Sequence, residues 1–408
     1  MIKGRDIVCI SFVTWDDHWG TPQQFMSRLA EHNRIFFVDQ PISPLSLFTG
    51  VRRRGAVMEQ FRRWRRGYRK VAKNVYAGAP PPILPLRYTK VANAVNAFIM
   101  RRWLARQTKR LGFRDPVYWN FQPSFPHLGR ATEPSLTVYH CVDDFASVPY
   151  WWHPAASVRA REIECCKESD LIVCTGRNLV ESRRHLNPNV HFVPEGADTS
   201  LFATAASPDT KIPDDIARLP GKVIGYIGVI DFRLDVELLT YLAKARPEWW
   251  FALVGPVKKD TDLGSLQALP NVHFFGNRKI EELPAYIKAM DVCLIPYVLN
   301  DYVHHVFPLK LYEYMAAGKP IVATDMAEMR PYAGDEMTLA RSSEEFLAAV
   351  EDAMAHDSPE RAMARQHAAR NESWDNRVEQ LSAILEPLLN EHERVPVRQT
   401  IGAEAAGS

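Results

Sequence analysis

Short apolar runs alternate with helical stretches along most of the chain, and this alternation limits the fold more than any other feature. Runs of strand length occur at 6–12, 34–39, 117–121, 136–141, 171–175 and 190–193, and again at 222–228, 250–255, 271–275, 292–297 and 320–323. Such alternation is typical of parallel β-sheets whose strands are joined by helices. A turn-rich stretch, 203–211, separates the two series. The sequence therefore predicts two α/β domains, 1–203 and 204–372.

Length and charge fit this organisation. The chain has 408 residues, and a domain usually holds about 100–200. The charged fraction of 24% and the net charge of +2 are those of an ordinary globular protein and indicate no nucleic-acid partner. The apolar run 7–13 is too short for a signal peptide, and no stretch reaches the about 20 apolar residues of a membrane span. We therefore expect a cytoplasmic protein.

The six cysteines form no pattern of metal ligands. Four of them lie inside apolar runs, where cysteine usually acts as a small buried hydrophobe. Cys165 and Cys166 are adjacent and cannot easily bridge each other. We expect free thiols in a reducing compartment, and neither a metal site nor a cofactor.

The segment 307–322 carries the clearest functional signal. Helix formers fill 310–317, Gly318 supplies a left-handed stop, and a predicted strand at 292–297 comes just before. The helix start should therefore lie at the carboxyl ends of parallel strands, where α/β proteins bind ligands. Lys310 adds a positive charge for phosphate, and Glu313 can accept two hydroxyl protons. A phosphate site beside a carboxylate indicates a nucleotide diphosphate.

The same segment resembles the donor-site motif of glycosyltransferase family 4 and its neighbours, which are retaining enzymes of the GT-B fold. That fold has two Rossmann-like domains facing each other across a cleft, with a C-terminal helix that crosses back to the first domain. The resemblance implies that Glu313 binds ribose. His305 stands where the family often carries a second Glu near the transferred sugar. The donor residues it implies are Gly228, Arg233, Arg278, His305, Pro308, Leu309, Lys310 and Glu313.

The loop after the run 222–228 supports a phosphate site independently of the family. Gly228 lets the backbone approach a ligand, and Arg233 offers a fork of donors. Many family members carry adjacent Arg and Lys here, whereas this chain has Arg233 and Leu234, so Lys310 is a candidate replacement. The alternative for Arg233 is an ion pair with Asp231 or Asp235. A G-x-G-x-x-G nicotinamide fingerprint is absent from this loop, which argues against a dehydrogenase.

Motifs in the first half resemble bacterial cell-surface polysaccharide glycosyltransferases of the teichuronic-acid type. These motifs are the loop 11–24, the turn 139–144 and the element 193–202, and Ser373-Trp374 resembles the start of the crossing helix, 373–394. The resemblance and the strand-end positions suggest catalytic roles for Asp16, Asp143 and His18, and acceptor or sugar contacts for Trp15, Trp19, Asp17 and Asp144. The alternatives are a helix cap for one of the paired aspartates and ordinary packing for the tryptophans.

A basic stretch, 51–73, combines ten Arg and Lys residues with one acid, Glu59. Val57, Phe61, Trp64, Tyr68 and Val71 recur in it at helical spacing, which is the pattern of an interfacial membrane helix. The residues proposed for contact with an anionic membrane are Phe61, Arg62, Arg63, Trp64, Arg65 and Arg66. The alternative is a helix that packs on its own domain and leaves a solvated basic face. The stretch opens a basic insert, 51–111, within the first domain.

Taken with the resemblance, these features predict a metal-independent, retaining glycosyltransferase. We expect a nucleotide-diphosphate sugar as donor, UDP-linked by family habit, and a glycan, glycolipid or polysaccharide as acceptor. Two alternatives stay open: a sugar-nucleotide epimerase of the same fold, and a degenerate scaffold that binds nucleotide or membrane without transfer. We expect the protein in the cytoplasm, with peripheral attachment to the inner face of the membrane as a further expectation. The tail 395–408 is predicted to be disordered.

Overall fold

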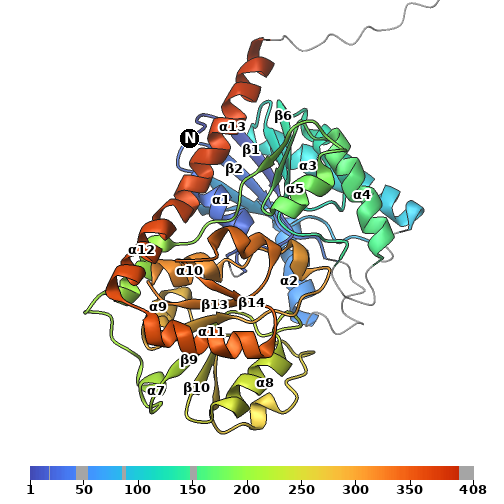
Figure 1. The fold of residues 1–408 in the computed structure, drawn as a ribbon. Coiled ribbons are helices and arrows are strands. Elements are labelled where there is room, and N and C mark those ends of the chain that lie inside the picture. Colours follow the sequence, from blue (N-terminus) through green and yellow to red (C-terminus); the bar gives the residue numbers. More distant parts are fainter. Residues whose placement is uncertain (18, 43–53, 85–88, 148–153, 395–408) are drawn as a thin grey trace, which may run out of the picture.

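The computed structural model describes residues 1–17, 19–42, 54–84, 89–147 and 154–394. They form two α/β domains, one above the other in Figure 1, each built around its own β-sheet. The predicted two-domain α/β architecture is therefore confirmed. His18, residues 51–53 and 85–88 of the basic insert, and the tail 395–408 lie outside the described residues.

Eight strands form the sheet of the first domain, in the order β3-β4-β2-β1-β5-β6-β7-β8. Neighbouring strands are parallel, except β3 and β4, which are antiparallel. The strands are β1 (Asp6–Ile10), β2 (Arg34–Val38), β3 (Tyr68–Ala72), β4 (Val75–Gly78), β5 (Val117–Asn120), β6 (Leu136–Cys141), β7 (Leu171–Cys174) and β8 (Val190–Phe192). The central strands are almost fully buried because helices cover the sheet, as their continuous apolar runs predict.

Six parallel strands form the sheet of the second domain, in the order β11-β10-β9-β12-β13-β14. They are β9 (Val223–Ile227), β10 (Trp250–Val254), β11 (Val272–Gly276), β12 (Val292–Ile295), β13 (Ile321–Thr324) and β14 (Thr338–Ala340). All the strands predicted from apolar runs are present in the two sheets. The sequence did not predict β3, β4 or β14.

Thirteen α-helices lie in the described part of the chain. They are α1 (Thr21–Leu29), α2 (Arg54–Arg66), α3 (Lys90–Leu111), α4 (Ala155–Glu168), α5 (Arg177–Arg183), α6 (Thr199–Ala203), α7 (Asp214–Ala217), α8 (Val236–Ala245), α9 (Leu283–Lys288), α10 (Lys310–Ala316), α11 (Ser343–His356), α12 (Pro359–Ala369) and α13 (Trp374–Arg394). Two 3-10 turns, η6 (Val303–His305) and η7 (Ala327–Tyr332), flank α10 in the sequence.

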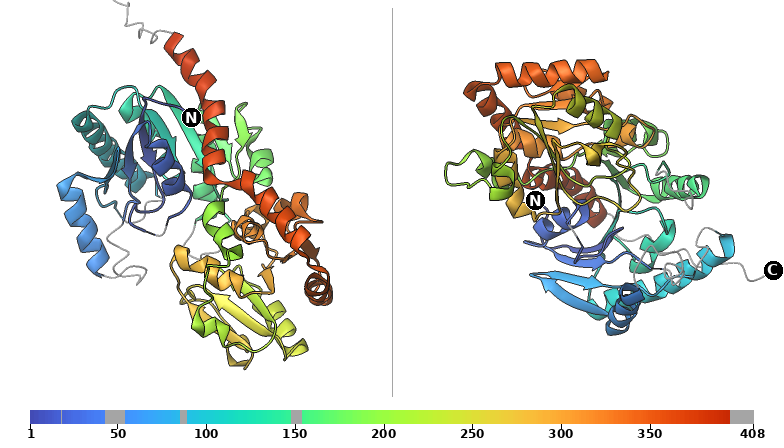
Figure 2. Two further views of the ribbon diagram at one scale, coloured as in Figure 1. Left: turned by 90° about the vertical axis from the view of Figure 1, so that its left-hand side faces the viewer. Right: turned by 90° about the horizontal axis from the view of Figure 1, so that it is seen from below.

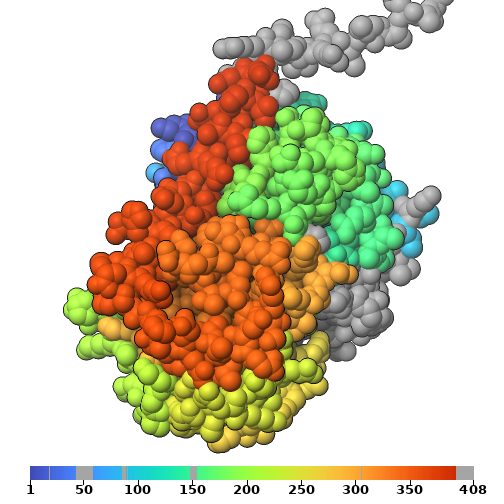
Figure 3. Space-filling model, in the orientation of Figure 1, coloured from blue at the N-terminus to red at the C-terminus, as the bar shows by residue number. Residues whose placement is uncertain are grey.

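The last helix, α13, joins the two domains, as the sequence predicted. It starts beside the second domain and runs along the first, which Figure 1 and the side view of Figure 2 both show. In the space-filling view of Figure 3 it forms an outer edge of the molecule. Five apolar side chains of this helix belong to the core of the first domain: Trp374, Val378, Leu381, Leu385 and Leu389.

The exact domain limits stay a prediction. Ala197 and Phe202 precede the predicted boundary at 203, yet both pack in the core of the second domain. Helix α6, which contains Phe202, contacts α9 and α10 of that domain. The chain therefore joins the second domain's core some residues before β9 begins.

The basic stretch 51–73 is not the single amphipathic helix that its spacing suggested. Helix α2 ends at Arg66, and Gly67 follows with φ +89°, a left-handed conformation that ends helices. The chain then enters β3, so Tyr68 and Val71 belong to a strand. Pairing of β3 with β4 replaces the helical hydrogen bonds, and the predicted apolar stripe is cut after Trp64.

Candidate active site

The predicted donor residues gather where β9, β12 and α10 meet in the second domain. Lys310 is 9% exposed, and its ammonium group donates a hydrogen bond to the Tyr297 hydroxyl. The same nitrogen lies 5.0 Å from the ring centre of Tyr226 and 4.7 Å from that of Tyr297. Aromatic faces attract a cation, so the two rings hold the charge at this place. Burial would raise the pKa of Tyr297, but Lys310 and Arg233 outweigh it and lower the pKa.

Gly228 makes room for this lysine. It has φ +129°, which side chains rarely tolerate. A Cβ atom at this position would lie 3.4 Å from the Lys310 nitrogen. Backbone at the end of β9 and the ammonium group of α10 therefore come together without an intervening side chain, as a phosphate site requires.

Glu313 lies one turn after Lys310, so the two side chains share a face of α10. Burial raises the pKa of Glu313 to about 7, and Lys310 partly opposes the shift. Within the described residues, the carboxylate accepts no hydrogen bond. It remains available to a ligand, and a neutral or charged form is accessible near physiological pH.

Arg233 forms an ion pair with Asp231, which the sequence analysis gave as the alternative to phosphate binding. Its Nε and Nη2 atoms donate to the two carboxylate oxygens of Asp231, each at 2.8 Å. The guanidinium carbon is 5.8 Å from the ring centre of Tyr297. Arg233 is therefore beside Lys310's aromatic partner, but its fork of donors is already engaged.

Two further predicted donor residues, Arg278 and His305, are not placed beside Lys310 and Glu313 by the described contacts. Arg278 donates to the Tyr286 hydroxyl at 2.6 Å and to Asp215 at 3.0 Å. It follows β11, which is three strands away from β12, or about 14 Å. Arg278 does not join Lys310 and Glu313 directly. His305 ends η6, and its side chain lies outside the part that the structure describes.

Two backbone N–H groups at the start of α10, where a phosphate was expected to bind, already donate hydrogen bonds to carbonyl groups of the chain. Leu311 N–H donates to the Pro308 carbonyl and Tyr312 N–H to the Leu309 carbonyl, both at 3.0 Å. These N–H groups are thus not free for a ligand. The Leu309 side chain packs against the core of the first domain, so this loop also ties the two domains together.

Carboxyl groups of the first domain face the donor residues across the domain interface. Tyr302 of the second domain donates a hydrogen bond to Asp143, and Arg233 lies near enough to favour its charge. Burial is nevertheless the larger effect and raises the pKa of Asp143 to about 6. Burial also raises the pKa of Glu195 to about 8, although Thr21 donates a hydrogen bond to it. The sequence missed Glu195 and Tyr302 as site residues, even though Glu195 lies within the recognised element 193–202.

A second tie between the domains involves Glu328 in η7. Its two carboxylate oxygens accept the backbone N–H groups of Arg177 and Asn178 at 2.9 and 2.8 Å. These residues begin α5 in the first domain, so a buried acid of one domain caps a helix of the other. Neither partner is unusual in sequence, and the contact could not be predicted from it.

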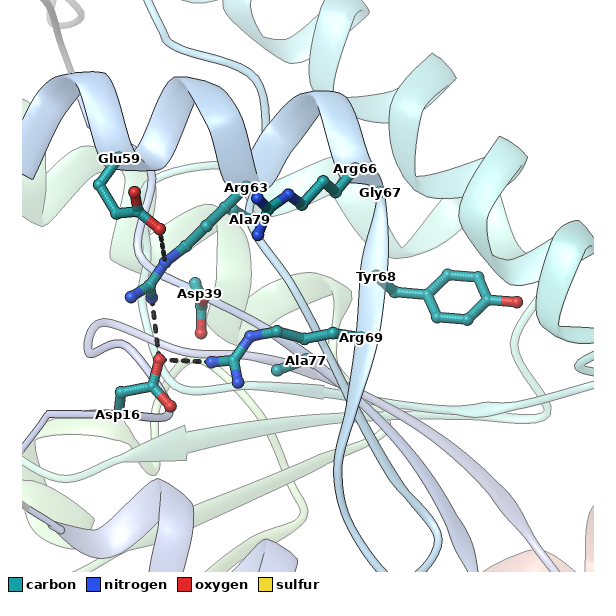
Figure 4. Close-up of a pocket in the computed structure, with 10 residues that line it drawn as sticks. All are labelled: Asp16, Asp39, Glu59, Arg63, Arg66, Gly67, Tyr68, Arg69, Ala77 and Ala79. Carbon is teal, nitrogen blue, oxygen red and sulfur yellow. Dashed lines mark hydrogen bonds and ion pairs between the residues drawn. The ribbon is translucent and has the colours of Figure 1, made fainter.

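Asp16 lies in a cavity of about 280 Å³ at the carboxyl ends of β1 and β2 (Figure 4). It accepts hydrogen bonds from Arg63, at 2.9 Å, and from Arg69. The hydrogen bond from Arg69, reinforced by Arg63, lowers the pKa of Asp16. Tyr68 points away from the carboxylates of this cavity (Figure 4).

Asp39 lines the same cavity and was missed as a site residue. Burial raises its pKa to about 6, although the backbone N–H of Trp15 donates to it at 2.9 Å. Its position directly after a buried strand was the available signal. The cavity thus joins two carboxylates of contrasting acidity with a group of arginines, and it could bind the hydroxyl groups of an acceptor sugar.

Three of the predicted acceptor residues make contacts within the first domain. Trp15 is 6% exposed and packs against Phe37 in the core of the first domain, so it cannot stack on a sugar. Asp17 accepts the N–H of Thr14 at 3.0 Å and closes its own turn, but the residue is exposed, so its contact with a sugar stays a prediction.

Asp144 is the third, and it is buried in the first domain. Arg159 and Ser147 donate to its carboxylate at 2.8 and 2.6 Å. Burial opposes ionisation, but these contacts outweigh it and lower the pKa of Asp144. Of the predicted acceptor residues, Asp17 and Trp19 are exposed, Trp19 at 46%.

The predicted membrane residues divide into two groups. Phe61, Arg62, Arg65 and Arg66 are exposed on α2. Arg63 instead turns toward Asp16 and Glu59, and Trp64 packs against the apolar cluster under α3. The packing alternative thus holds for these two residues. No helix in the described part of the chain is long and apolar enough to cross a membrane.

The described residues offer neither a cluster of metal ligands nor an exposed thiol. No cluster of three His, Cys, Asp or Glu side chains there could hold a metal ion. All six cysteines are buried and free.

Comparison with known proteins first defines the class. Over 95% of this chain and 100% of that one, the fold matches a sucrose-phosphate synthase from Thermosynechococcus elongatus with a TM-score of 0.69 at 15% identity. It also matches Anabaena Alr3699/HepE, solved in complex with UDP and glucose, with a TM-score of 0.62 at 14% identity over 94% and 100% of the chains. The fold is GT-B, the class of two-domain glycosyltransferases that the sequence resembled.

Sequence relatives then define the family. Residues 221–356 match the model of the family described as glycosyl transferases group 1. The chain is 30% identical over 275 residues to the putative teichuronic acid biosynthesis glycosyltransferase TuaH of Bacillus subtilis (strain 168), covering 63% of this chain and 68% of that protein. The chain therefore belongs to the group 1 glycosyltransferases, and it is an enzyme of that family.

Proposed function

We propose that this glycosyltransferase transfers a sugar from a UDP-sugar to a glycan, glycolipid or polysaccharide acceptor, with retention of anomeric configuration and without a metal ion. The observation that carries the proposal is the pair Lys310 and Glu313 on one face of α10, beside Gly228. A cation held by two aromatic rings and a hydroxyl group suits a diphosphate. A carboxylate free of protein partners in the described chain suits the two hydroxyl groups of a ribose.

In the proposed reaction, the bond between the anomeric carbon and the donor's phosphate oxygen breaks. A bond from the same carbon to the acceptor oxygen forms, and the acceptor's proton passes to the leaving diphosphate. The leaving group gains negative charge in the transition state, which Lys310 is placed to stabilise. Arg233 contributes a second positive charge, which its ion pair with Asp231 partly neutralises.

The first domain would supply the acceptor side. Asp143 faces Arg233 and Tyr302 and can accept a hydrogen bond from a hydroxyl of the transferred sugar or the acceptor. Asp16 and Asp39 line the cavity of Figure 4, where further acceptor hydroxyls could bind. Asp16, Asp143 and His18 stay proposed as catalytic residues, and Asp17 and Trp19 as sugar contacts.

The proteins that this chain resembles support this choice of substrates, although their ligands and names belong to those proteins. One structural neighbour was solved with UDP and glucose, and one with UDP alone. The sequence relative is named for teichuronic acid biosynthesis. A cell-surface polysaccharide, or a lipid that carries its growing chain, is therefore the proposed acceptor class.

Calorimetric titration with UDP, GDP, ADP and their sugar conjugates, in the absence of metal, tests the donor site. We expect selective binding of UDP and its conjugates. Glu313→Ala should weaken binding at least about tenfold, because hydrogen bonds to a charged group contribute about 1.5–3 kcal/mol. Glu237→Ala, which removes an exposed Glu of α8, is the matched control and should bind as the parent does.

Product analysis separates the alternatives. Transfer of the sugar to an acceptor supports the proposal, whereas an epimerised sugar nucleotide would identify the epimerase. Binding of UDP without any turnover would identify a degenerate scaffold. Equal affinity of the parent and Glu313→Ala for UDP would remove Glu313 from the site.

A further inference from the structure

A groove of about 450 Å³ lies between the end of α2 and the second half of α3; none of the proposed donor residues lines it, and it shares Gly67 with the Asp16 cavity. Trp64 and Arg65 of α2 line one side of it. Trp103 and neighbours one turn apart on α3 line the other side. The glycosyltransferase reaction described above makes no use of this groove.

The groove is strongly and uniformly basic. Four arginines line it, Arg65, Arg102, Arg106 and Arg110, and no acidic side chain is among the described residues that do so. In the described part of the chain, none of the four forms an ion pair with a carboxylate. Arg102 and Arg110 instead lie over the rings of Phe98 and Tyr68, each at 5.6 Å. Four unneutralised guanidinium groups around one groove call for an anionic ligand.

Two polar atoms in the wall of the groove support a bound ligand independently of the charge. Trp103 and Gln107 are 7% and 4% exposed. The Trp103 Nε1–H and the Gln107 Oε1 atom have no hydrogen-bond partner among the described residues. Buried polar atoms without a partner are costly, by about 1–3 kcal/mol each. A phosphate oxygen would satisfy the indole donor, and a hydroxyl group attached to that phosphate would satisfy the amide oxygen.

The groove opens onto an exposed apolar strip of α3. Val91, Val95 and Phe98 recur at spacings of four and three residues, so they share one face of the helix. Val91 is 77% exposed and Phe98 60%. Ile99, next to this strip, also lines the groove. Apolar side chains held in water beside a basic groove match a ligand that has an anionic head and a hydrocarbon chain.

We propose that the groove between α2 and α3 binds the phosphate group of a membrane lipid, with the strip Val91, Val95 and Phe98 contacting the hydrocarbon region of the bilayer. This site differs from the α2 stripe predicted from sequence, because most of the residues that line it belong to α3. It does not depend on the proposed donor or on sugar transfer. It would place the first domain against an anionic membrane surface.

Flotation of the full chain with lipid vesicles tests the proposal. The protein should float with phosphatidylcholine vesicles that contain phosphatidylglycerol, and not with phosphatidylcholine alone. Arg102→Glu with Arg106→Glu should weaken this binding at least about tenfold, because each basic group near an anionic leaflet adds appreciable affinity. The matched control is Lys167→Glu with Arg184→Glu, two exposed residues of the first domain, in α4 and just after α5, that do not line the groove. The control should change binding by less than about threefold.

Two results would overturn the site. One is an equal loss of binding in both charge-reversal pairs, which would mean that only the overall charge matters. The other is an absence of binding to anionic vesicles in the parent.

A second pair of variants separates a lipid from a soluble phosphate compound. Val95→Ser with Phe98→Ser should lower flotation but keep the calorimetric affinity for inorganic pyrophosphate, which Arg102→Glu with Arg106→Glu should lose. Unchanged flotation of the serine variant would contradict the contact between the apolar strip and the bilayer. Pyrophosphate binding by a parent protein that does not float would contradict the lipid and leave a soluble phosphate compound as the ligand. Circular dichroism checks that each variant is folded. Titration with UDP reports on the donor site separately, so failure of one proposal is distinguishable from failure of the other.

Discussion

The proposed donor site and the proposed acceptor cavity of this enzyme differ in how many segments of the chain contribute to them. On the donor side, Gly228, Lys310 and Glu313 all belong to one domain, and two of them lie in one short segment of sequence. The cavity around Asp16 draws instead on β1, β2, α2, β3 and β4. The match to the family model, residues 221–356, covers only the donor side. The proposed donor residues therefore lie within the matched region, whereas the residues that line the cavity lie outside it.

The two sides also differ in charge. Lys310 is held by aromatic rings and a hydroxyl group, which leaves its positive charge unneutralised for a ligand. In the acceptor cavity, Arg63 is neutralised by Asp16 and Glu59. A diphosphate fits the first arrangement, and an acceptor rich in hydroxyl groups fits the second.

Lys310→Met should have the largest effect and tests the donor half of the comparison. Removal of the cation that faces the leaving diphosphate should lower turnover about 100- to 1,000-fold, as for other groups that stabilise developing charge. Initial rates of UDP release would measure it. Lys244→Met, on the exposed face of α8, should leave the rate unchanged. A normal rate for Lys310→Met would assign the leaving group to another cation.

Asp16→Asn tests the acceptor half. The substitution removes the charge that holds Arg63 and Arg69, so we expect transfer to the acceptor to fall at least about tenfold. The dissociation constant for UDP should stay within about twofold, because the donor residues belong to the other domain. Loss of UDP affinity in this variant would mean that the two sides are not separate.

The pH dependence of donor binding should sharpen the contrast between the carboxylates. Because the pKa of Glu313 is raised to about 7, its charged form is lost as the pH falls through that value. Only the charged form accepts two ribose hydroxyl groups, so affinity for UDP-glucose should fall about tenfold between about pH 8 and pH 6. The neutral variant Glu313→Gln should bind weakly at both values. Calorimetry at several pH values measures this, and a flat profile in the parent would contradict it.

Glu328→Gln should have the smallest effect, since it alters the tie between the two halves rather than either site. The neutral amide still accepts a hydrogen bond but no longer places a charge at the start of α5. We expect a loss of about 1 kcal/mol in the free energy of unfolding, seen as a lower melting temperature. Glu344→Gln, at the exposed start of α11, provides the comparison. A stability loss of the same size in both variants would show that the interdomain position has no special importance.

The sequence predicted the donor side better than the acceptor side, for physical reasons. Lys310 and Glu313 follow from local spacing on one helix, and the central strands follow from continuous apolar runs. Strand β3 could not be predicted, because its sequence Tyr68–Ala72 is basic and partly exposed and continues the spacing of α2. Only the conformation of Gly67 separates them. The burial of Trp15 and the pairing of Asp144 with Arg159 depend on contacts between segments far apart in the chain.

The packing of α13 has a consequence for the order of folding during synthesis. Chains emerge from the ribosome amino end first, and the first domain of a protein usually folds first. Here the core of the first domain includes Trp374, Val378, Leu381, Leu385 and Leu389, which are translated after the entire second domain. Until they arrive, the apolar surface that they cover stays open to water and to chaperones. The second domain should therefore complete its fold earlier on the ribosome, and the amino-terminal domain should be the last to close.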